Sequence, residues 1–370
     1  MEKNTIIILT LILITIFTGC FKDSKKTKSE DNTPHFISSI ASYYKNGAAF
    51  GEEQSIFLDF DTMKTSPLCA KPNCNHITFE CLANNVGSSP VFYNNYIYYF
   101  TSDYGTKETP DGPEFYINSK LMKASLETSA AEVVCEFHDC VPPERGLVNF
   151  VRYKNELYFV GDDYNPKKDE SGLFFYTNVG GNHFLCSINL DTGEYTNFGS
   201  IYDGDKEYEA AAYSSNSFIT GVYNNKMYLA YNFVKDNDKL QSGGDFETTH
   251  LSFEFDFETK TWKESELPYS RFMNNDSYIY YDFENKSVNI IYKDKELKFP
   301  LEYEIVNYRE FNGKLFMPAQ GKWYDLSDCS EHSMGEYEGY DVIAYYDNSY
   351  ILLYQGLTAK ITEEELLALE

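Results

Sequence analysis

One hairpin unit recurs along this chain and limits its possible folds more than any other feature of the sequence. Each copy is an apolar run, a two-residue turn and a second run rich in aromatic residues. Copies lie at 91–100, 151–160, 221–230, 308–317 and 344–354, with a weaker one at 42–50. Turn pairs such as Asn94-Asn95 and Asn312-Gly313 tolerate the positive φ that tight hairpins require. The repeat therefore predicts many short antiparallel strands.

A second kind of turn follows most hairpins and completes a larger repeat. Short turns at 59–62, 125–128, 189–192 and 256–259 end in Thr, and side-chain hydrogen bonds can close them. Two hairpins make a four-stranded unit of about 48 residues, which fits a propeller blade. Blade starts near 37, 89, 147, 218, 271, 304 and 339 predict an all-β propeller of about seven four-stranded blades. Six blades are the alternative, because 271–300 is short and YDFEN at 281–285 could be a turn of the second kind.

Composition agrees with an all-β fold and excludes one class of partner. The chain has 33 Tyr and 28 Phe, which favour strands, and its only helix-like segment is the tail at 362–369. The formal net charge is −26. A body this acidic is repelled by phosphate backbones, so we expect no nucleic-acid partner.

The N-terminus carries an export signal. Lys3 precedes an apolar stretch at 5–17 that is too short to span a bilayer, and small residues follow it. Residues 17–20, Phe-Thr-Gly-Cys, resemble the lipobox of bacterial lipoproteins, although that family prefers Leu at the place of Phe17. The resemblance implies removal of the signal peptide 1–19 and lipid on Cys20. It also implies anchoring at the outer face of the cell membrane. We expect residues 20–36 to form a lipidated, polar, disordered tether and 37–370 to form the propeller.

The hairpin pattern over 37–370 resembles that of bacterial surface lipoproteins with six-bladed TolB-like or low-density-lipoprotein-receptor-like propellers. The shared motifs are degenerate, so the resemblance implies a fold rather than an activity.

Three insertions indicate a binding face. If the strands of each blade are called A to D, the insertions at 101–118, 161–182 and 233–248 all fall between strands B and C, at the same end of their blades. Aromatic rings beside carboxylates suit a glycan or peptide, whereas the alternative is that the loops only cover blade edges. The candidate ligand residues are Asp103, Tyr104, Tyr116, Asp162, Asp163, Tyr164, Phe174, Tyr176, Asp236 and Asp238.

A cysteine-histidine cluster is the candidate metal site. Cys69, Cys74, His76 and Cys81 form C-x4-C-x-H-x4-C, and three thiolates with one imidazole could hold tetrahedral zinc. Disulfides, also involving Cys135 and Cys140, are the alternative for an exported chain, and free thiols are a third reading. Cys186 and Cys329 stand alone in the sequence.

The sequence contains no G-x-S-x-G, H-E-x-x-H or phosphate-binding glycine motif. We therefore expect a non-catalytic, membrane-anchored extracellular protein whose propeller face binds a glycan, peptide or protein. One alternative is a polysaccharide hydrolase or lyase that uses carboxylates of that face. The other is a structural subunit of a surface complex.

Overall fold

The computed structural model divides into two units, Met1–Thr33 and Pro34–Glu370. Its described residues are 34–37, 41–51, 54–78, 81–87, 90–110, 112–142, 149–162, 167–168, 174–175, 183–201, 209–210, 217–234, 248–268, 272–274, 277–282, 285–300 and 308–369. Cys20, the predicted lipidation site, lies outside them. Over the described ranges, no helix has the length and apolar character needed to cross a bilayer.

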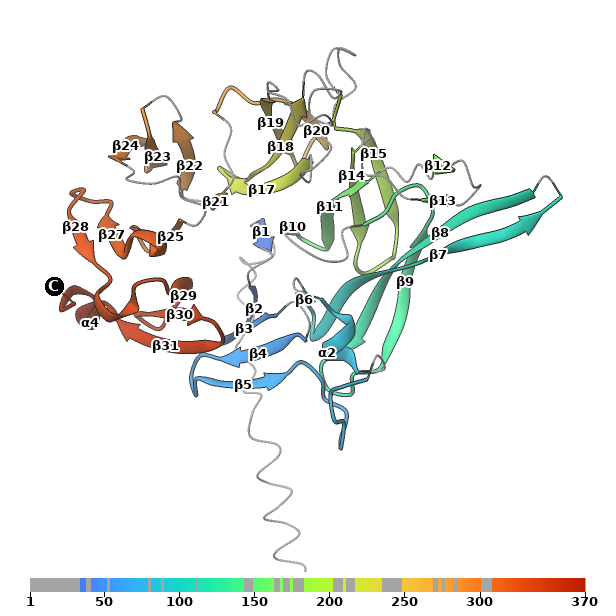
Figure 1. The fold of residues 1–370 in the computed structure, drawn as a ribbon, viewed down its shortest axis with the longest axis horizontal. Helices are drawn as coiled ribbons and strands as arrows, with labels where there is room; N and C mark the ends of the chain where they lie inside the picture. The colour runs from blue at the N-terminus through green and yellow to red at the C-terminus, as the bar shows by residue number, and fades with distance from the viewer. Residues whose placement is uncertain are drawn as a thin grey trace, which may run out of the picture. The chain divides into compact units, whose positions relative to one another are not determined.

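The second unit is a propeller of seven antiparallel blades, which follow one another in chain order (Figure 1). Blade 1 consists of β2 (Ser42–Tyr44), β3 (Gly47–Phe50), β4 (Ile56–Asp59) and β5 (Lys64–Pro67). Blade 2 consists of β6 (Val91–Tyr93), β7 (Tyr96–Thr109), β8 (Gly112–Ser125) and β9 (Ala131–Phe137). Blade 3 consists of β10 (Phe150–Tyr153), β11 (Glu156–Asp162), β14 (His183–Asn189) and β15 (Tyr195–Ser200). Blade 4 consists of β17 (Ser217–Tyr223), β18 (Lys226–Val234), β19 (Thr248–Asp256) and β20 (Thr261–Glu264). Blade 5 consists of β21 (Phe272–Asn274), β22 (Ser277–Asp282), β23 (Ser287–Tyr292) and β24 (Lys295–Pro300). Blade 6 consists of β25 (Arg309–Phe311), β26 (Lys314–Met317), β27 (Lys322–Asp325) and β28 (Glu331–Ser333). Blade 7 consists of β29 (Asp341–Tyr346), β30 (Ser349–Tyr354) and β31 (Leu357–Thr362). The prediction of seven blades is confirmed, and the six-blade alternative is wrong.

Turn chemistry explains why the strands end where they do. Asn94 and Asn95 have φ of 48° and 64°, as a two-residue hairpin turn requires. In the second kind of turn, Asp256 Oδ1 accepts hydrogen bonds from the backbone N–H of Thr259 at 2.9 Å and from its hydroxyl at 3.2 Å. Asp59 receives the same two bonds from Thr62. Both predicted turn types are therefore present.

Blade 5 is short because its strands B and C are joined by a short connection. Asp282 of β22 pairs with Ser287 of β23, so 281–285 falls at the junction of strands B and C, and the turn between strands C and D is Lys293-Asp294, with φ of 48° and 61°. The reading of 281–285 as a turn of the second kind was therefore wrong.

The buried core lies in the seams between blades. Seven apolar clusters occupy the seven seams, including the one between blades 7 and 1, where Leu58 and Phe50 meet Ile343 and Ile351. In the described part of the chain, blade 7 has three strands. A short helix, α4 (Glu363–Leu367), follows them.

The first strand does not complete the last blade. β1 (His35–Ile37) pairs with β10 of blade 3, antiparallel, with Phe36 opposite Val151. Blades 7 and 1 are joined by side chains instead: Lys360 Nζ donates to Phe60 O at 3.2 Å, and Tyr346 Oη donates to Asp61 Oδ1 at 3.0 Å.

Candidate metal centre and binding face

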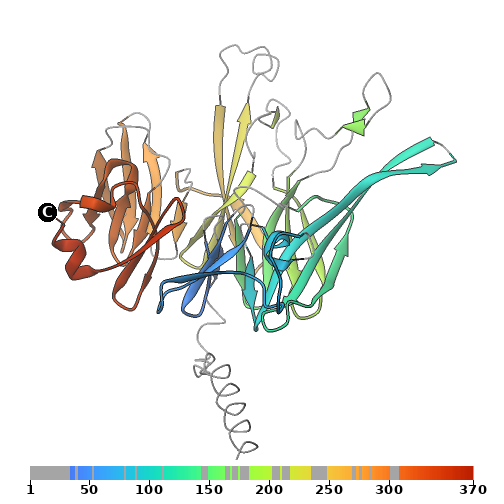
Figure 2. The ribbon, with the colours of Figure 1, turned by 60° about the horizontal axis from the view of Figure 1, so that its bottom comes forward.

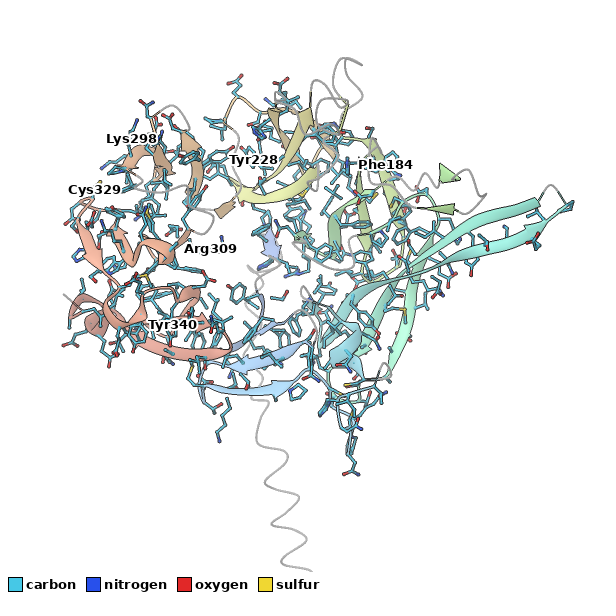
Figure 3. The ribbon with its side chains drawn as sticks, viewed as in Figure 1. Phe184, Tyr228, Lys298, Arg309, Cys329 and Tyr340 are labelled. Carbon is cyan, nitrogen blue, oxygen red and sulfur yellow. The ribbon has the colours of Figure 1, made fainter. Side chains whose placement is uncertain are left out.

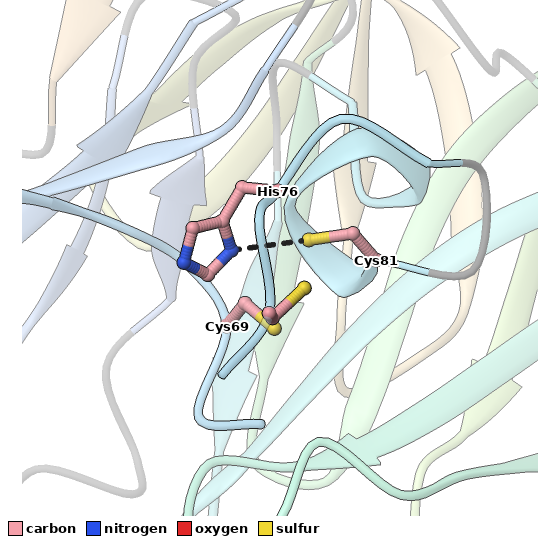
Figure 4. A group of neighbouring side chains, drawn as sticks. Cys69, His76 and Cys81 are labelled. Atoms are coloured by element: carbon pink, nitrogen blue, oxygen red, sulfur yellow. Dashed lines mark hydrogen bonds between the residues drawn. The ribbon is translucent and has the colours of Figure 1, made fainter. Parts of the chain in front are cut away.

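Four predicted metal ligands converge in the link between blades 1 and 2. Cys69, Cys74, His76 and Cys81 each offer one ligand atom, and these atoms lie within 4.8 Å of one another. Figure 4 shows the labelled side chains of Cys69, His76 and Cys81 pointing toward one another. Tetrahedral zinc, with bonds of about 2.3 Å to sulfur and about 2.0 Å to nitrogen, separates its ligands by about 3.5–3.8 Å. His76 Nδ1 already lies 3.4 Å from Cys81 Sγ, so a small contraction of the cluster would fit the ion.

The loop that carries these side chains has an unusual but well-supported backbone. His76 has a positive φ of 59°, which is uncommon for a residue other than glycine. Two amide side chains hold its carbonyl: Gln54 Nε2 donates at 2.6 Å and Asn84 Nδ2 at 3.1 Å. Cys81 directly precedes helix α2 (Leu82–Asn85) and is fully buried. The backbone at His76 and the buried Cys81 are therefore held in place by local structure.

The cluster lies across the seam between two blades. The Ser55 N–H, in the connection between β3 and β4 of blade 1, donates to Ala83 O at 2.8 Å. The Ala70 N–H, next to Cys69, donates to Ser129 Oγ at 2.7 Å, and Ser129 belongs to the turn between β8 and β9 of blade 2. The link thus bonds to both blades, so a metal that held its four ligands together would brace the link at the seam between them.

The thiols of the cluster differ in acidity. Burial raises the pKa of Cys81 to about 11, and hydrogen bonds with Cys69 and Cys74 add to this effect. Burial also acts to raise the pKa of Cys69, but hydrogen bonds with the Lys71 backbone and with the neighbouring thiols outweigh it, so that pKa falls below its usual value. The Cys69 thiol is therefore more acidic than the Cys81 thiol. Metal binding would release the remaining thiol protons.

A second sulfur contact was not anticipated from the sequence. Cys140 Sγ lies 3.8 Å from Cys186 Sγ, and both residues are fully buried. Cys135, the predicted alternative partner of Cys140, contacts the carbonyl of Glu136 at 3.8 Å. Cys329 is exposed at the periphery of blade 6 (Figure 3). All seven cysteines of the propeller unit are thiols in this structure.

The first predicted insertion is a β-arm rather than a loop. β7 and β8 each have 14 residues and stay paired up to Thr109 and Gly112. The outer part of this hairpin, residues 101–118, extends well away from the rest of blade 2 (Figures 1 and 2). The sequence analysis did not predict these long strands because residues 101–115 are mostly polar and contain two glycines and two prolines, a composition typical of loops.

Two candidate ligand residues of the arm contact its own strands. Asp103 Oδ2 pairs with Lys120 Nζ at 3.0 Å, which links neighbouring strands at the base of the arm. Tyr116 is 41% exposed and lies opposite Gly105, where an added Cβ would meet its ring at 3.2 Å. The Tyr116 ring therefore packs over the glycine, which has no side chain, and remains partly exposed to solvent. Tyr104 pairs through its backbone with Ile117.

Asp162 contributes to the framework of blade 3. Its Oδ1 lies 2.7 Å from Nδ1 of the buried His183, and its backbone makes two hydrogen bonds with Val141, each of 2.9 Å. Phe174 lies in β13 (Phe174–Phe175), which pairs with β12 (Lys167–Lys168). Asp163, Tyr164, Tyr176, Asp236 and Asp238 lie outside the described residues. The contacts of Asp103 and Tyr116 thus lie within the arm, and those of Asp162 are with His183 and Val141.

Comparison with known proteins finds likeness only among solved structures. No family model matches the chain, and no curated protein matches it. The structure of YjhT matches at 14% identity and a TM-score of 0.39, over 89% of this chain and 98% of that one. An oligogalacturonate lyase in complex with manganese matches at 11% identity and a TM-score of 0.30, over 90% and 92% of the two chains. The extracellular domain of BT4673 from B. thetaiotaomicron matches at 8% identity and a TM-score of 0.23, over 93% and 72%.

Proposed function

We propose that this protein is an exported lipoprotein whose propeller binds an extracellular peptide, protein or glycan with the arm of β7 and β8. The arm is the observation that carries the proposal. Two strands of 14 residues continue beyond the blade, and an isolated two-stranded ribbon is only marginally stable in water. Among the described strands, the outer parts of β7 and β8 pair with each other, and the exposed ring of Tyr116 suits an extended partner that packs on it.

Binding is tested by shortening the arm. Ser102 and Ser119 are cross-strand partners, so residues 103–118 can be replaced by an Asn-Gly turn that keeps the register. In a screen of cell-wall glycans and peptides, we expect the full chain to bind and the shortened variant to lose at least tenfold in affinity. Its melting temperature should stay within about 2 °C. Equal binding by both proteins would reject the arm as the binding element.

A single-residue pair sharpens this test. Tyr116→Ala removes the exposed ring of the arm, while Tyr354→Ala removes a ring of equal exposure on blade 7. Only the first substitution should weaken binding. Anchoring is tested separately by fractionation, where Cys20→Ala should move the protein from the membrane to the soluble extracellular fraction.

We further propose that Cys69, Cys74, His76 and Cys81 hold a structural zinc ion. The convergence of the four ligand atoms within 4.8 Å supports this. Because the link bonds to both blades, the ion would stabilise the seam between blades 1 and 2.

Native mass spectrometry of protein purified without added metal tests the zinc site. We expect one zinc ion per chain, lost from Cys74→Ser and retained by Cys329→Ser, a control at an exposed thiol. A chelator should lower the melting temperature of the parent protein but not of Cys74→Ser. A metal-free mass that lacks the hydrogens of these thiols would show disulfides instead.

A further inference from the structure

A buried pair of thiols joins blades 2 and 3. Cys140 follows β9, the fourth and outer strand of blade 2, and Cys186 lies on β14, the third strand of blade 3. Their sulfur atoms are 3.8 Å apart, and both also contact Tyr195 Oη, at 3.4 Å and 3.3 Å. A seam of the propeller thus brings together two cysteines that are 46 positions apart in the chain.

The surrounding chain holds Cys140 against blade 3. Val141 and Asp162 exchange two backbone hydrogen bonds of 2.9 Å, which attach the segment after β9 to the end of β11. Gly161 is the residue that Cys140 faces, and a Cβ there would come within 2.6 Å of Cys140 Sγ. Any larger residue at position 161 would displace the thiol, so the approach of the two sulfurs depends on this glycine.

The folded environment disfavours ionisation of the Cys186 thiol. The hydrogen bond with Cys140 and burial among apolar rings both raise the pKa of the Cys186 thiol far above its usual value. Because the thiolate is the reactive form in disulfide exchange, the Cys186 thiol reacts poorly once the blades have closed and buried both cysteines. Oxidation therefore belongs to the folding stage, when the seam is still open.

We infer that Cys140 and Cys186 form a disulfide bond as the chain folds in an oxidising compartment. In this step the two S–H bonds break and one S–S bond forms. The two electrons and two protons pass to an exchangeable disulfide, such as oxidised glutathione, which becomes two thiols. Since Ser119 Oγ donates to Cys140 O at 3.1 Å, the bond would fix the base of the arm to blade 3.

Peptide mapping of the full chain tests this inference independently of ligand binding or lipid anchoring. The protein is reduced, unfolded and refolded with or without oxidised glutathione, and its free thiols are then alkylated. A glutamate-specific protease separates the cysteines, because Glu136 lies between Cys135 and Cys140 and Cys186 falls on a third peptide. We expect a crosslink of the Cys140 and Cys186 peptides, short of two hydrogen atoms, only in the oxidised sample.

Two variants provide the controls. Cys135→Ser should keep the crosslink, and Cys186→Ser should abolish it and leave Cys140 alkylated. The oxidised parent should melt about 4 °C above its reduced form, a difference absent in Cys186→Ser. A bridge between Cys135 and Cys140 would overturn the inference. So would glutathione adducts or free thiols at positions 140 and 186 after oxidative refolding.

Discussion

Three charged side chains of blade 4 meet where a carboxylate is largely buried. Glu254 on β19 lies 2.7 Å from Lys226 Nζ and 3.2 Å from Lys263 Nζ, and its own side chain is 14% exposed. Burial acts to raise the pKa of Glu254, but hydrogen bonds from both lysines outweigh it and hold the pKa below its usual value of 4.5. The ionised form is therefore favoured by folding.

This arrangement predicts a pH-dependent cost for Glu254→Gln. Because folding lowers the pKa, the carboxylate stabilises the protein above the unfolded pKa, and this contribution is lost as pH falls through the folded value. We expect the variant to lose about 1–2 kcal/mol of unfolding free energy at pH 7 and much less near pH 3. Urea denaturation at both pH values measures this, with Glu264→Gln on the neighbouring β20 as an exposed control. Equal losses at both pH values would contradict it.

At the scale of elements, α4 packs against the seam between blades 6 and 7. Leu366 of this helix is buried with Phe316 and Trp323 of blade 6 and with Tyr350 of blade 7. A capping box starts the helix: the Glu365 N–H donates to Thr362 Oγ1 at 3.2 Å, and the Thr362 N–H donates to Glu365 Oε2 at 2.8 Å. Lys314 Nζ of blade 6 also pairs with Glu363 Oε1 at 2.6 Å.

The cap predicts a measurable role for Thr362. Replacing it with Ala removes the acceptor for a helix N–H and should cost about 1 kcal/mol of unfolding free energy. Thr362→Ser keeps the hydroxyl and should cost far less. Chemical denaturation of the three proteins compares them. Identical midpoints for the Ala and Ser variants would show that side-chain burial alone positions the helix.

At the scale of the whole molecule, the seams differ in how many of their described apolar residues are buried. Among the described residues, the seam between blades 4 and 5 contains three buried residues, Tyr223, Tyr228 and Tyr278. The seam between blades 3 and 4 contains 13. One parallel backbone pair, Gly221 with Met273, also joins blades 4 and 5.

This difference predicts where the propeller opens first. Local openings expose the regions with the least buried apolar contact, so hydrogen exchange should be faster in β21 and β22 than in β11 and β18. Native-state exchange read by mass spectrometry tests the order. Uniform protection across all blades would indicate that the propeller opens only as a whole.

The blades could be predicted because their turns depend on residues close together in the sequence. Contacts between segments far apart in the sequence could not be predicted in this way. Asn94-Asn95 and Asp256 act within a few residues, so their turns and the seven-blade count could be inferred from spacing. The cysteine cluster could be proposed because its four members lie within 13 positions of one another. The approach of Cys140 to Cys186 could not, because it depends on how two blades pack. The pairing of β1 with β10 also crosses two intervening blades.

The pairing of β1 with β10 has a consequence for the order of assembly. Each blade is built from contiguous sequence, so its hairpins can form without waiting for distant parts of the chain. His35–Ile37 must instead wait for Phe150–Tyr153 before its backbone is paired. Contacts such as that of Lys360 with Phe60 join residues 300 positions apart and can form only at the end. We therefore expect blade formation to be rapid and closure of the ring to be the slow, concluding step of folding.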